Sequence, residues 1–185
     1  MSETDAWTET LERERAQKDQ FFAVHPGSPI PADRREEFDG LAYFPPDPAL
    51  RFELPLHEHD EKEAITVETT TEGERDYLTW GEFRFGVGGV EVTLQAYKAD
   101  PDDERLWVPF RDATSGEESY GAGRYLDLEP ERHLTAEGRW VLDFNRAYNP
   151  SCAYSPAYEC PLVPMENWLD VPIRAGERTD TSPAS

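Results

Sequence analysis

The stretch FRFGVGGVEVTLQA, residues 83–96, contains the pattern that decides the fold. Apolar and polar side chains alternate on both sides of its central glycines; the apolar positions are Phe83, Phe85, Val90, Val92, Leu94 and Ala96. Alternation with a period of two is typical of a strand that buries one face, and glycines supply the positive φ angles that tight hairpin turns need. Residues 83–96 are therefore predicted to form an antiparallel β-hairpin.

Other short stretches with strand patterns lie between turn residues. They are residues 52–56, 65–69, 106–110, 123–128, 139–145 and 169–173. About eight strands at such close spacing favour an antiparallel β-barrel or a sandwich-like domain. The sequence thus predicts one mainly β domain over residues 25–178, with a long ordered loop from Arg146 to Asn167 and a disordered tail at residues 179–185.

Residues 1–24 are predicted to form an α-helix that packs on this domain. Ser2 or Thr4 can cap its N-terminus, and large apolar side chains fall near one stripe: Trp7, Leu11, Phe21 and Phe22. A second, short helix is predicted over residues 31–38, where a proline stands at the first helical position.

The charge of the chain is strongly negative, with a formal net charge of −21 at pH 7 and a pI of about 4.4. Acidic residues are scattered, and Lys18, Lys62 and Lys98 are the only lysines. Such a surface predicts a halophilic protein, because carboxylates keep the surface hydrated where molar salt screens their repulsion. No basic stripe is available to neutralise phosphates, so no nucleic-acid partner is expected.

The chain also carries no apolar run near the roughly 20 residues that a membrane helix needs. Its N-terminal residues are charged where a signal peptide would be apolar. We therefore expect a cytoplasmic protein without a membrane partner, while the oligomeric state stays open.

Polar residues gather at the end of the predicted strand 139–145 and in the loop behind it. If Trp140, Leu142 and Phe144 face the core, Asp143 and Asn145 face solvent, a covering segment or a cavity. The candidate ligand-binding residues are Arg124, Asp143, Asn145, Tyr148 and Asn149. A guanidinium offers two parallel donors and an amide both donates and accepts, so this set predicts a small polar or anionic ligand at one barrel mouth. The alternative is a buried polar network that holds the loop on the domain.

Two other classes of function stay open. An enzyme using the same pocket would need Asp143 as a general base or Cys152 as a nucleophile. A protein-interaction module would present the aromatic segment Tyr43–Pro48 together with Trp168. We lean toward a binding protein over an enzyme, because no motif with an assigned mechanism occurs in the sequence.

Neither a metal nor a cofactor is expected. The sequence His57-Glu58-His59 would place two imidazoles on one strand face, but no second ligand cluster accompanies it. The spacing between Cys152 and Cys160 matches neither the CxxC motif of redox proteins nor the cysteine spacing of zinc sites. We expect two reduced thiols packed beneath the loop, with Cys152 as the candidate reactive thiol.

Several motifs spread along the chain form a specific set. They are RDATSG at 111–116, YGAGRY at 120–125, LDFN at 142–145, NPSCAY at 149–154, CPLVPMEN at 160–167 and IRAGE at 173–177. Residues 15–21, Ser28-Pro29 and 38–41 fit the same pattern. The set resembles the family labelled domain of unknown function 1684 and spans nearly the whole chain.

The resemblance implies a single domain without an assigned activity, in a family of bacteria and archaea. Some relatives resemble exported lipoproteins, but from the charged N-terminal residues we expect no such leader here. With the acidic surface, the resemblance suggests a haloarchaeal source.

Overall fold

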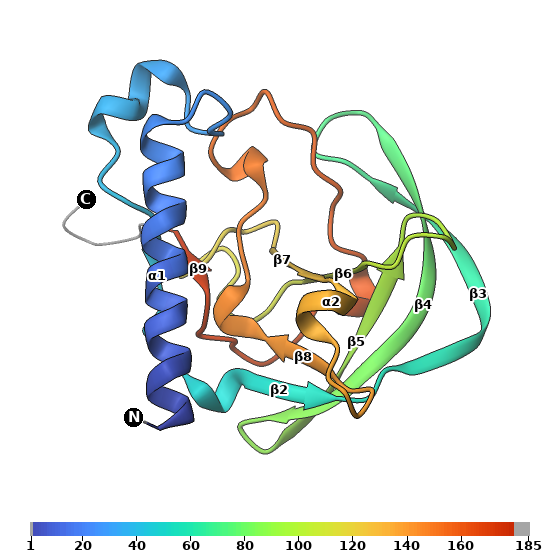
Figure 1. The fold of residues 1–185 in the computed structure, drawn as a ribbon. Coiled ribbons are helices and arrows are strands. Elements are labelled where there is room, and N and C mark those ends of the chain that lie inside the picture. Colours follow the sequence, from blue (N-terminus) through green and yellow to red (C-terminus); the bar gives the residue numbers. More distant parts are fainter. Residues whose placement is uncertain (1, 180–185) are drawn as a thin grey trace.

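The computed structural model describes residues 2–179, which form three antiparallel sheets with a long helix alongside (Figure 1). The largest sheet has the order β3-β4-β5-β6-β7, with β3 at His57–Glu68, β4 at Glu74–Val87, β5 at Val90–Lys98, β6 at Leu106–Phe110 and β7 at Arg124–Leu128. The small sheets pair β2 (Arg51–Leu54) with β8 (Trp140–Asp143) and β1 (Ala42–Tyr43) with β9 (Glu177–Arg178). The prediction of a mainly β fold with an N-terminal helix is confirmed, although the sheets of residues 2–179 do not close into a barrel.

The predicted hairpin is strands β4 and β5. Phe83 lies opposite Leu94 and Phe85 opposite Val92, so the apolar side chains share one face of the sheet. The turn contains Gly88 at φ 56° and Gly89 at φ 82°, in the left-handed region that favours glycine.

The apolar core lies between that face of the large sheet and the β2-β8 pair. Its buried members include Phe83, Leu94, Leu106, Val108, Phe110, Leu126, Leu128, Trp140, Leu142, Phe144, Val171 and Ile173. Each large side chain fully buried here contributes roughly 1.5–3 kcal/mol. Trp140, Leu142 and Phe144 all face this core, as the alternation along the strand predicts.

The large sheet has a gap between β5 and β6, which pair only at Tyr97 and Trp107. The side-chain amide of Asn167 fills this gap. Its Oδ1 accepts from the Gln95 amide at 2.8 Å, and its Nδ2 donates to the carbonyls of Gln95 at 2.9 Å and Pro109 at 2.7 Å. Asn167, in the 3₁₀ turn η5 (Met165–Asn167), therefore fixes the end of the long loop to the sheet.

Helix α1 spans Glu3–Val24 and lies on the opposite side of the molecule from β3 and β4 (Figure 1). Ser2 caps it, accepting from the Asp5 amide at 3.1 Å. Leu11 and Phe22 are its buried residues, and Trp7 is half-buried. The expectation that Phe21 packs on the domain was wrong, because its ring stacks on His25 at 4.2 Å beyond the helix end and stays exposed.

The shorter helical segments fill the connections between strands. They are η1 at Ala32–Glu37, η2 at Pro48–Leu50, α2 at Pro130–His133, η3 at Phe144–Arg146 and η4 at Ser151–Ala153. Within residues 2–179, no helix is both long and apolar enough to span a bilayer.

The predicted last strand at residues 169–173 is absent. Leu169 and Val171 instead make single backbone hydrogen bonds to Arg111 at 2.8 Å and Ala113 at 3.0 Å. Pro172 has no N–H and cannot continue a ladder, and the last strand forms further on as β9. Most of the predicted tail, residues 180–185, lies outside the described residues.

Candidate functional site

Arg124 opens β7 and its side chain is fully buried beside Asp112, 3.3 Å from Nη2. Nη2 also donates to the Ile173 carbonyl at 2.8 Å, while Nη1 donates to the carbonyls of Ala175 and Glu177. Burial lowers the pKa of Arg124, and the Asp112 carboxylate opposes this shift. Arg124 thus holds the chain segment 173–177 against the large sheet.

Asp112, which the sequence did not single out as a site residue, completes this anchor. Its carboxylate accepts from the Thr114 hydroxyl at 2.9 Å and from the Ile173 amide at 2.6 Å. Because two charges in a dry environment are stable only when they are paired and hydrogen-bonded, these contacts explain how Arg124 can be buried.

Asp143 and Asn145 lie at the junction of β8 and η3, where both are buried. The Asp143 carboxylate accepts from Trp7 Nε1 at 2.8 Å, from Arg146 Nη1 at 2.6 Å, and from the Asn145 backbone amide and side-chain Nδ2 at 3.0 and 2.9 Å. The Asn145 side chain also exchanges hydrogen bonds of 2.8 Å with both backbone groups of Asp47. These two residues therefore join β8, the segment before β2, and α1.

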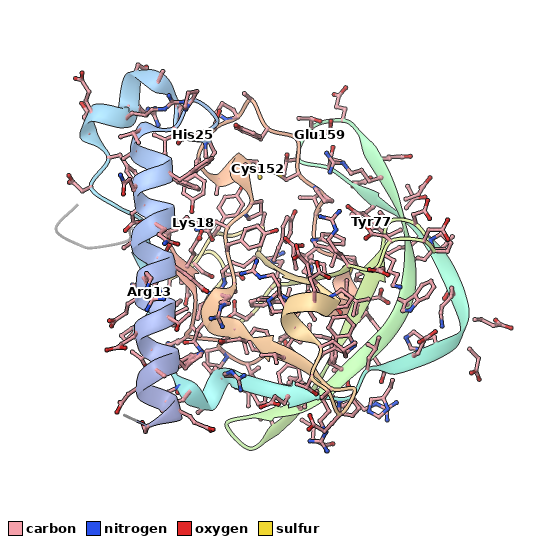
Figure 2. The ribbon with its side chains drawn as sticks, viewed as in Figure 1. Arg13, Lys18, His25, Tyr77, Cys152 and Glu159 are labelled. Atoms are coloured by element: carbon pink, nitrogen blue, oxygen red, sulfur yellow. The ribbon has the colours of Figure 1, made fainter. Side chains whose placement is uncertain are left out.

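Glu177 in β9 is the buried centre of a second polar cluster, at 2% exposure. Its carboxylate accepts from the Asn149 amide at 3.0 Å and from the Tyr154 hydroxyl at 2.8 Å. It also pairs with Lys18, which lies in the C-terminal half of α1 (Figure 2). The Glu177 cluster therefore joins the helix, the long loop and the C-terminal strand.

Four buried side-chain polar atoms have no hydrogen-bond partner within residues 2–179: Arg15 Nε, Tyr43 Oη, Arg124 Nε and Asn149 Oδ1. All four belong to residues around Glu177. Arg124 and Asn149 both donate to Glu177. The pKa of Tyr43 is raised mainly by burial and also by the Glu177 charge, which acts on Arg15 as well. An unsatisfied buried group costs about 1–3 kcal/mol, so these four atoms are the least stabilised polar groups of this region.

A cavity of about 140 Å³ lies beside this cluster, beneath α1. Its lining residues are Leu11, Glu14, Arg15, Lys18, Tyr43, Asn145, Arg146, Ala147 and Glu177. Of its three cations, Lys18 pairs with Glu177, and Arg146 pairs with Glu14 and Asp143. Arg15 makes no ion pair within the described residues.

The direct contacts of the Arg15 guanidinium are with neutral groups. It donates to the carbonyls of Phe44 at 3.1 Å and Asn145 at 3.2 Å, and it lies 4.3 Å from the centre of the Tyr43 ring. Arg15 therefore brings a positive charge to the cavity wall without a direct ion pair, although the charges of Asp143, Glu12 and Glu177 act on it from farther away.

The other residues that the sequence predicted for the site differ in how they lie relative to Glu177 and the cavity. The Tyr148 hydroxyl donates to Asp127, away from Glu177, although Lys18 Nζ lies 5.1 Å from the Tyr148 ring. Asn149 Nδ2 donates to the Tyr154 hydroxyl at 3.1 Å. Cys152 is half-buried and lies outside the cavity lining.

Asn145 therefore lines the cavity, and Arg124 and Asn149 donate to Glu177, which also lines it. Tyr148 and Cys152 lie outside the lining. The sequence-based site missed residues contributed by other elements: Arg15, Lys18, Tyr43, Tyr154 and Glu177. One signal was available for Lys18, since a lysine is rare in a chain whose cations are nearly all arginine.

The aromatic segment considered for protein contacts is mostly covered. Phe44 is 3% exposed and Tyr43 is half-buried against α1 and β9. Trp168, 46% exposed, has the Arg111 guanidinium 4.3 Å from its ring centre and lies on a different part of the chain. The two parts therefore contribute only one exposed aromatic side chain between them.

Comparison with known proteins identifies a family and one close structural relative. A family model described as a protein of unknown function, DUF1684, matches residues 36–178, so the chain belongs to that family. A solution NMR structure of an uncharacterised protein from Haloarcula marismortui is similar to it, with 43% sequence identity, a TM-score of 0.73 and 97% of each chain covered. No curated protein matches the sequence.

Proposed function

We propose that this member of the DUF1684 family binds a small anionic molecule in the cavity between α1 and β9. The observation that carries the proposal is the Arg15 guanidinium at the wall of that cavity, which makes no direct ion pair within the described residues. A carboxylate or similar oxyanion accepts from the guanidinium and pairs with its charge.

The cavity is small, at about 140 Å³, and open to solvent. We propose a short carboxylic acid or an inorganic oxyanion as its ligand. Glu14 and Glu177 also line the cavity, so a ligand bearing a hydroxyl or ammonium group beside its anionic group fits the donor and acceptor pattern.

The residues predicted from the sequence take two roles in this proposal. Asn145 lines the cavity and is a contact residue, while Arg124, Asp143 and Asn149 hold the segments that form its walls. Tyr148 supports the floor below Lys18. The binding region therefore lies beneath α1, and the helix has a direct part in it.

We further propose that the protein works in the cytoplasm of a halophile. The formal charge of −21 and the scattered carboxylates support this setting, and so does the likeness to a protein of Haloarcula marismortui. Under these conditions chloride is an abundant competitor, so the ligand must gain affinity from hydrogen bonds as well as from charge.

The first experiment is native mass spectrometry of the purified protein, followed by thermal melts with acetate, malonate and inorganic phosphate at constant KCl. A ligand present at 100 times its Kd stabilises the folded state by about 2.7 kcal/mol. We expect at least one of these anions to raise the melting temperature of the parent protein.

Arg15→Gln should remove this shift. Arg13→Gln is the matched control, since Arg13 is an exposed cation on the same helix (Figure 2). Equal ligand shifts in the two variants, or no retained ligand and no shift with any of the three anions, would contradict the proposal.

A further inference from the structure

The two cysteines of the chain lie next to each other, although neither takes part in the cavity. Cys152 is in η4, and Cys160 follows at the end of the loop that returns toward β3. The Cys152 backbone amide donates to the Cys160 sulfur at 3.4 Å. Both thiols are free.

This contact brings the sulfur of Cys160 close to Cys152. The amide nitrogen is bonded directly to the Cys152 Cα, so the Cys160 sulfur lies within about 5 Å of that Cα atom. A disulfide, with its Cα atoms roughly 4.4–6.8 Å apart, requires the sulfur to come somewhat nearer. Side-chain rotation with a small movement of the intervening loop is therefore enough to join the sulfurs.

The surroundings of the two thiols differ. Cys152 is half-buried, whereas Cys160 is 7% exposed. Burial raises the pKa of the Cys160 thiol, which keeps it protonated at neutral pH. Cys152 is thus the thiol that a reagent reaches first.

A hydroxyl group lies beside the accessible sulfur. The Tyr120 oxygen is 3.6 Å from Cys152 Sγ, and burial, followed by that thiol, raises the pKa of Tyr120 to about 12. Tyr120 therefore remains protonated and can donate to a thiolate at Cys152.

The chain between the cysteines is a surface loop. Residues 156–159 are exposed, and Glu159 directly precedes Cys160 in this loop. Two side chains from other elements hold this segment at Glu159: the Thr69 hydroxyl donates to its carboxylate at 2.7 Å, and Arg75 Nη2 donates to its carbonyl at 3.1 Å. Movement of the loop to close a disulfide therefore disturbs no buried apolar side chain between residues 156 and 159.

We propose that Cys152 and Cys160 are a redox-active pair that closes into a reversible disulfide by exchange with low-molecular-weight disulfides. The Cys152 thiolate attacks one sulfur of the small disulfide, forming a mixed disulfide and releasing one small thiolate. Cys160 then gives its proton to water, and its sulfur attacks the Cys152 sulfur and releases the second small thiolate. The protein loses two protons and two electrons, and the small disulfide is reduced to two thiolates.

Closure of this bond acts on the Glu177 cluster through Tyr154. Tyr154 lies between the two cysteines in sequence, and its hydroxyl donates to Glu177 at 2.8 Å and accepts from Asn149 at 3.1 Å. A shift of η4 changes these bonds and hence the wall below Lys18. The control of ligand affinity by this route rests on the proposed function, whereas the disulfide itself does not.

The test uses the native protein in buffers of reduced and oxidised glutathione at a series of ratios. We expect intact mass to fall by two hydrogen atoms and both thiols to become inaccessible to alkylation, without prior unfolding. A reductant should restore the original mass. A persistent glutathione adduct on Cys152, or oxidation that occurs only in denaturant, would overturn the proposal.

Cys152→Ser and Cys160→Ser are clean controls, because each variant retains a single cysteine. Both should fail to lose two hydrogen atoms. We expect glutathione to add faster to Cys160→Ser, which keeps the accessible Cys152, than to Cys152→Ser, which keeps the buried Cys160. The reverse order would contradict the assigned direction of attack.

Hydrogen exchange then tests the link to Glu177. Oxidation should change the protection of the amide of Asn149, which donates to the Glu177 carboxylate. Unchanged exchange there, with the disulfide formed, would overturn the link while leaving anion binding intact. Absence of an anion-induced melting shift in both redox states would instead contradict the proposed function alone.

Discussion

The two ion pairs that act on segment 173–177 differ in what surrounds them. Arg124 and Asp112 are both 0% exposed and lie between the large sheet and the C-terminal segment. In the other pair, Lys18 is 33% exposed and Glu177 is 2% exposed, at the edge of a cavity. The first pair fastens the segment to the sheet, and the second fastens α1 to the segment.

This comparison separates an anchor from a candidate binding site. Removing two charges from water costs several kcal/mol per ion, and only close pairing with further hydrogen bonds offsets it. Asp112 has such bonds from four groups of the chain, counting Arg124, Thr114, Ser115 and the Ile173 amide. Arg124 Nε in the first pair also has no hydrogen-bond partner within the described residues, but Arg124 lies outside the cavity lining. The second pair differs because Lys18 and Glu177 line the cavity themselves, together with Arg15.

The largest effect is expected for Arg124→Met. The substitution leaves the Asp112 carboxylate buried without its counter-ion, which costs about 3–5 kcal/mol of unfolding free energy. Urea unfolding at fixed KCl measures this cost. A change below about 1 kcal/mol would show that segment 173–177 does not depend on the pair.

A second variant controls for the lost charge. Replacing both partners, as Arg124→Met with Asp112→Leu, removes the uncompensated carboxylate, and we expect it to be more stable than Arg124→Met alone. The double substitution also removes acceptors for Thr114 and the Ile173 amide, so recovery should be partial.

A smaller loss is expected for Asn145→Ala, at about 1–3 kcal/mol, because both backbone groups of Asp47 lose their partner. Thermal melts with and without the anion identified for the parent protein measure the two roles of Asn145. If it is only an anchor, the anion-induced shift persists in the variant. Loss of the anion shift with unchanged stability would place Asn145 in the binding site alone.

The sequence predicted the local elements better than the contacts between them. The hairpin at 83–96 and the helix from residue 3 follow from alternation, glycine turns and a serine cap, all of which are local. The clamp of Asn167 across β5 and β6 joins residues about 60 to 70 positions apart, and no periodicity encodes such a contact.

The candidate site illustrates the same limit. The alternation of Trp140, Leu142 and Phe144 correctly oriented β8 and so put Asp143 on the opposite side. It could not show that Trp7 and Arg15, more than 120 residues earlier, cover that side. The packing of a helix depends on the shape of the surface that it covers and on polar partners far away in the sequence, and no local sequence pattern predicts either of them.

A third prediction concerns the attachment of α1. Trp7→Phe keeps an aromatic side chain of smaller size but removes the indole N–H that donates to Asp143, at an expected cost of about 1 kcal/mol for the lost hydrogen bond. Hydrogen exchange should also speed up in the first turns of α1, and leave the amides of β4 and β5 unchanged. Equal exchange in parent and variant would show that the remaining contacts of the helix suffice to hold it.

The smallest effect expected is a dependence on salt that distinguishes the two pairs. Exposed charges interact over a Debye length of about 10 Å at ~0.1 M salt and about 3 Å at 1 M, while fully buried pairs are screened far less. Lys18→Gln leaves Glu177 with the Asn149 and Tyr154 donors at the edge of an open cavity, so it should cost less than Arg124→Met at ~0.1 M KCl, and less again at ~2 M. The cost of Arg124→Met should be the same at both concentrations.

Each cost is a difference from the parent protein in the same salt, so the general stabilisation that salt gives to a chain of net charge −21 cancels. An Arg124→Met cost that falls with salt as steeply as that of Lys18→Gln would mean that water reaches both pairs, and the distinction between anchor and binding site would fail.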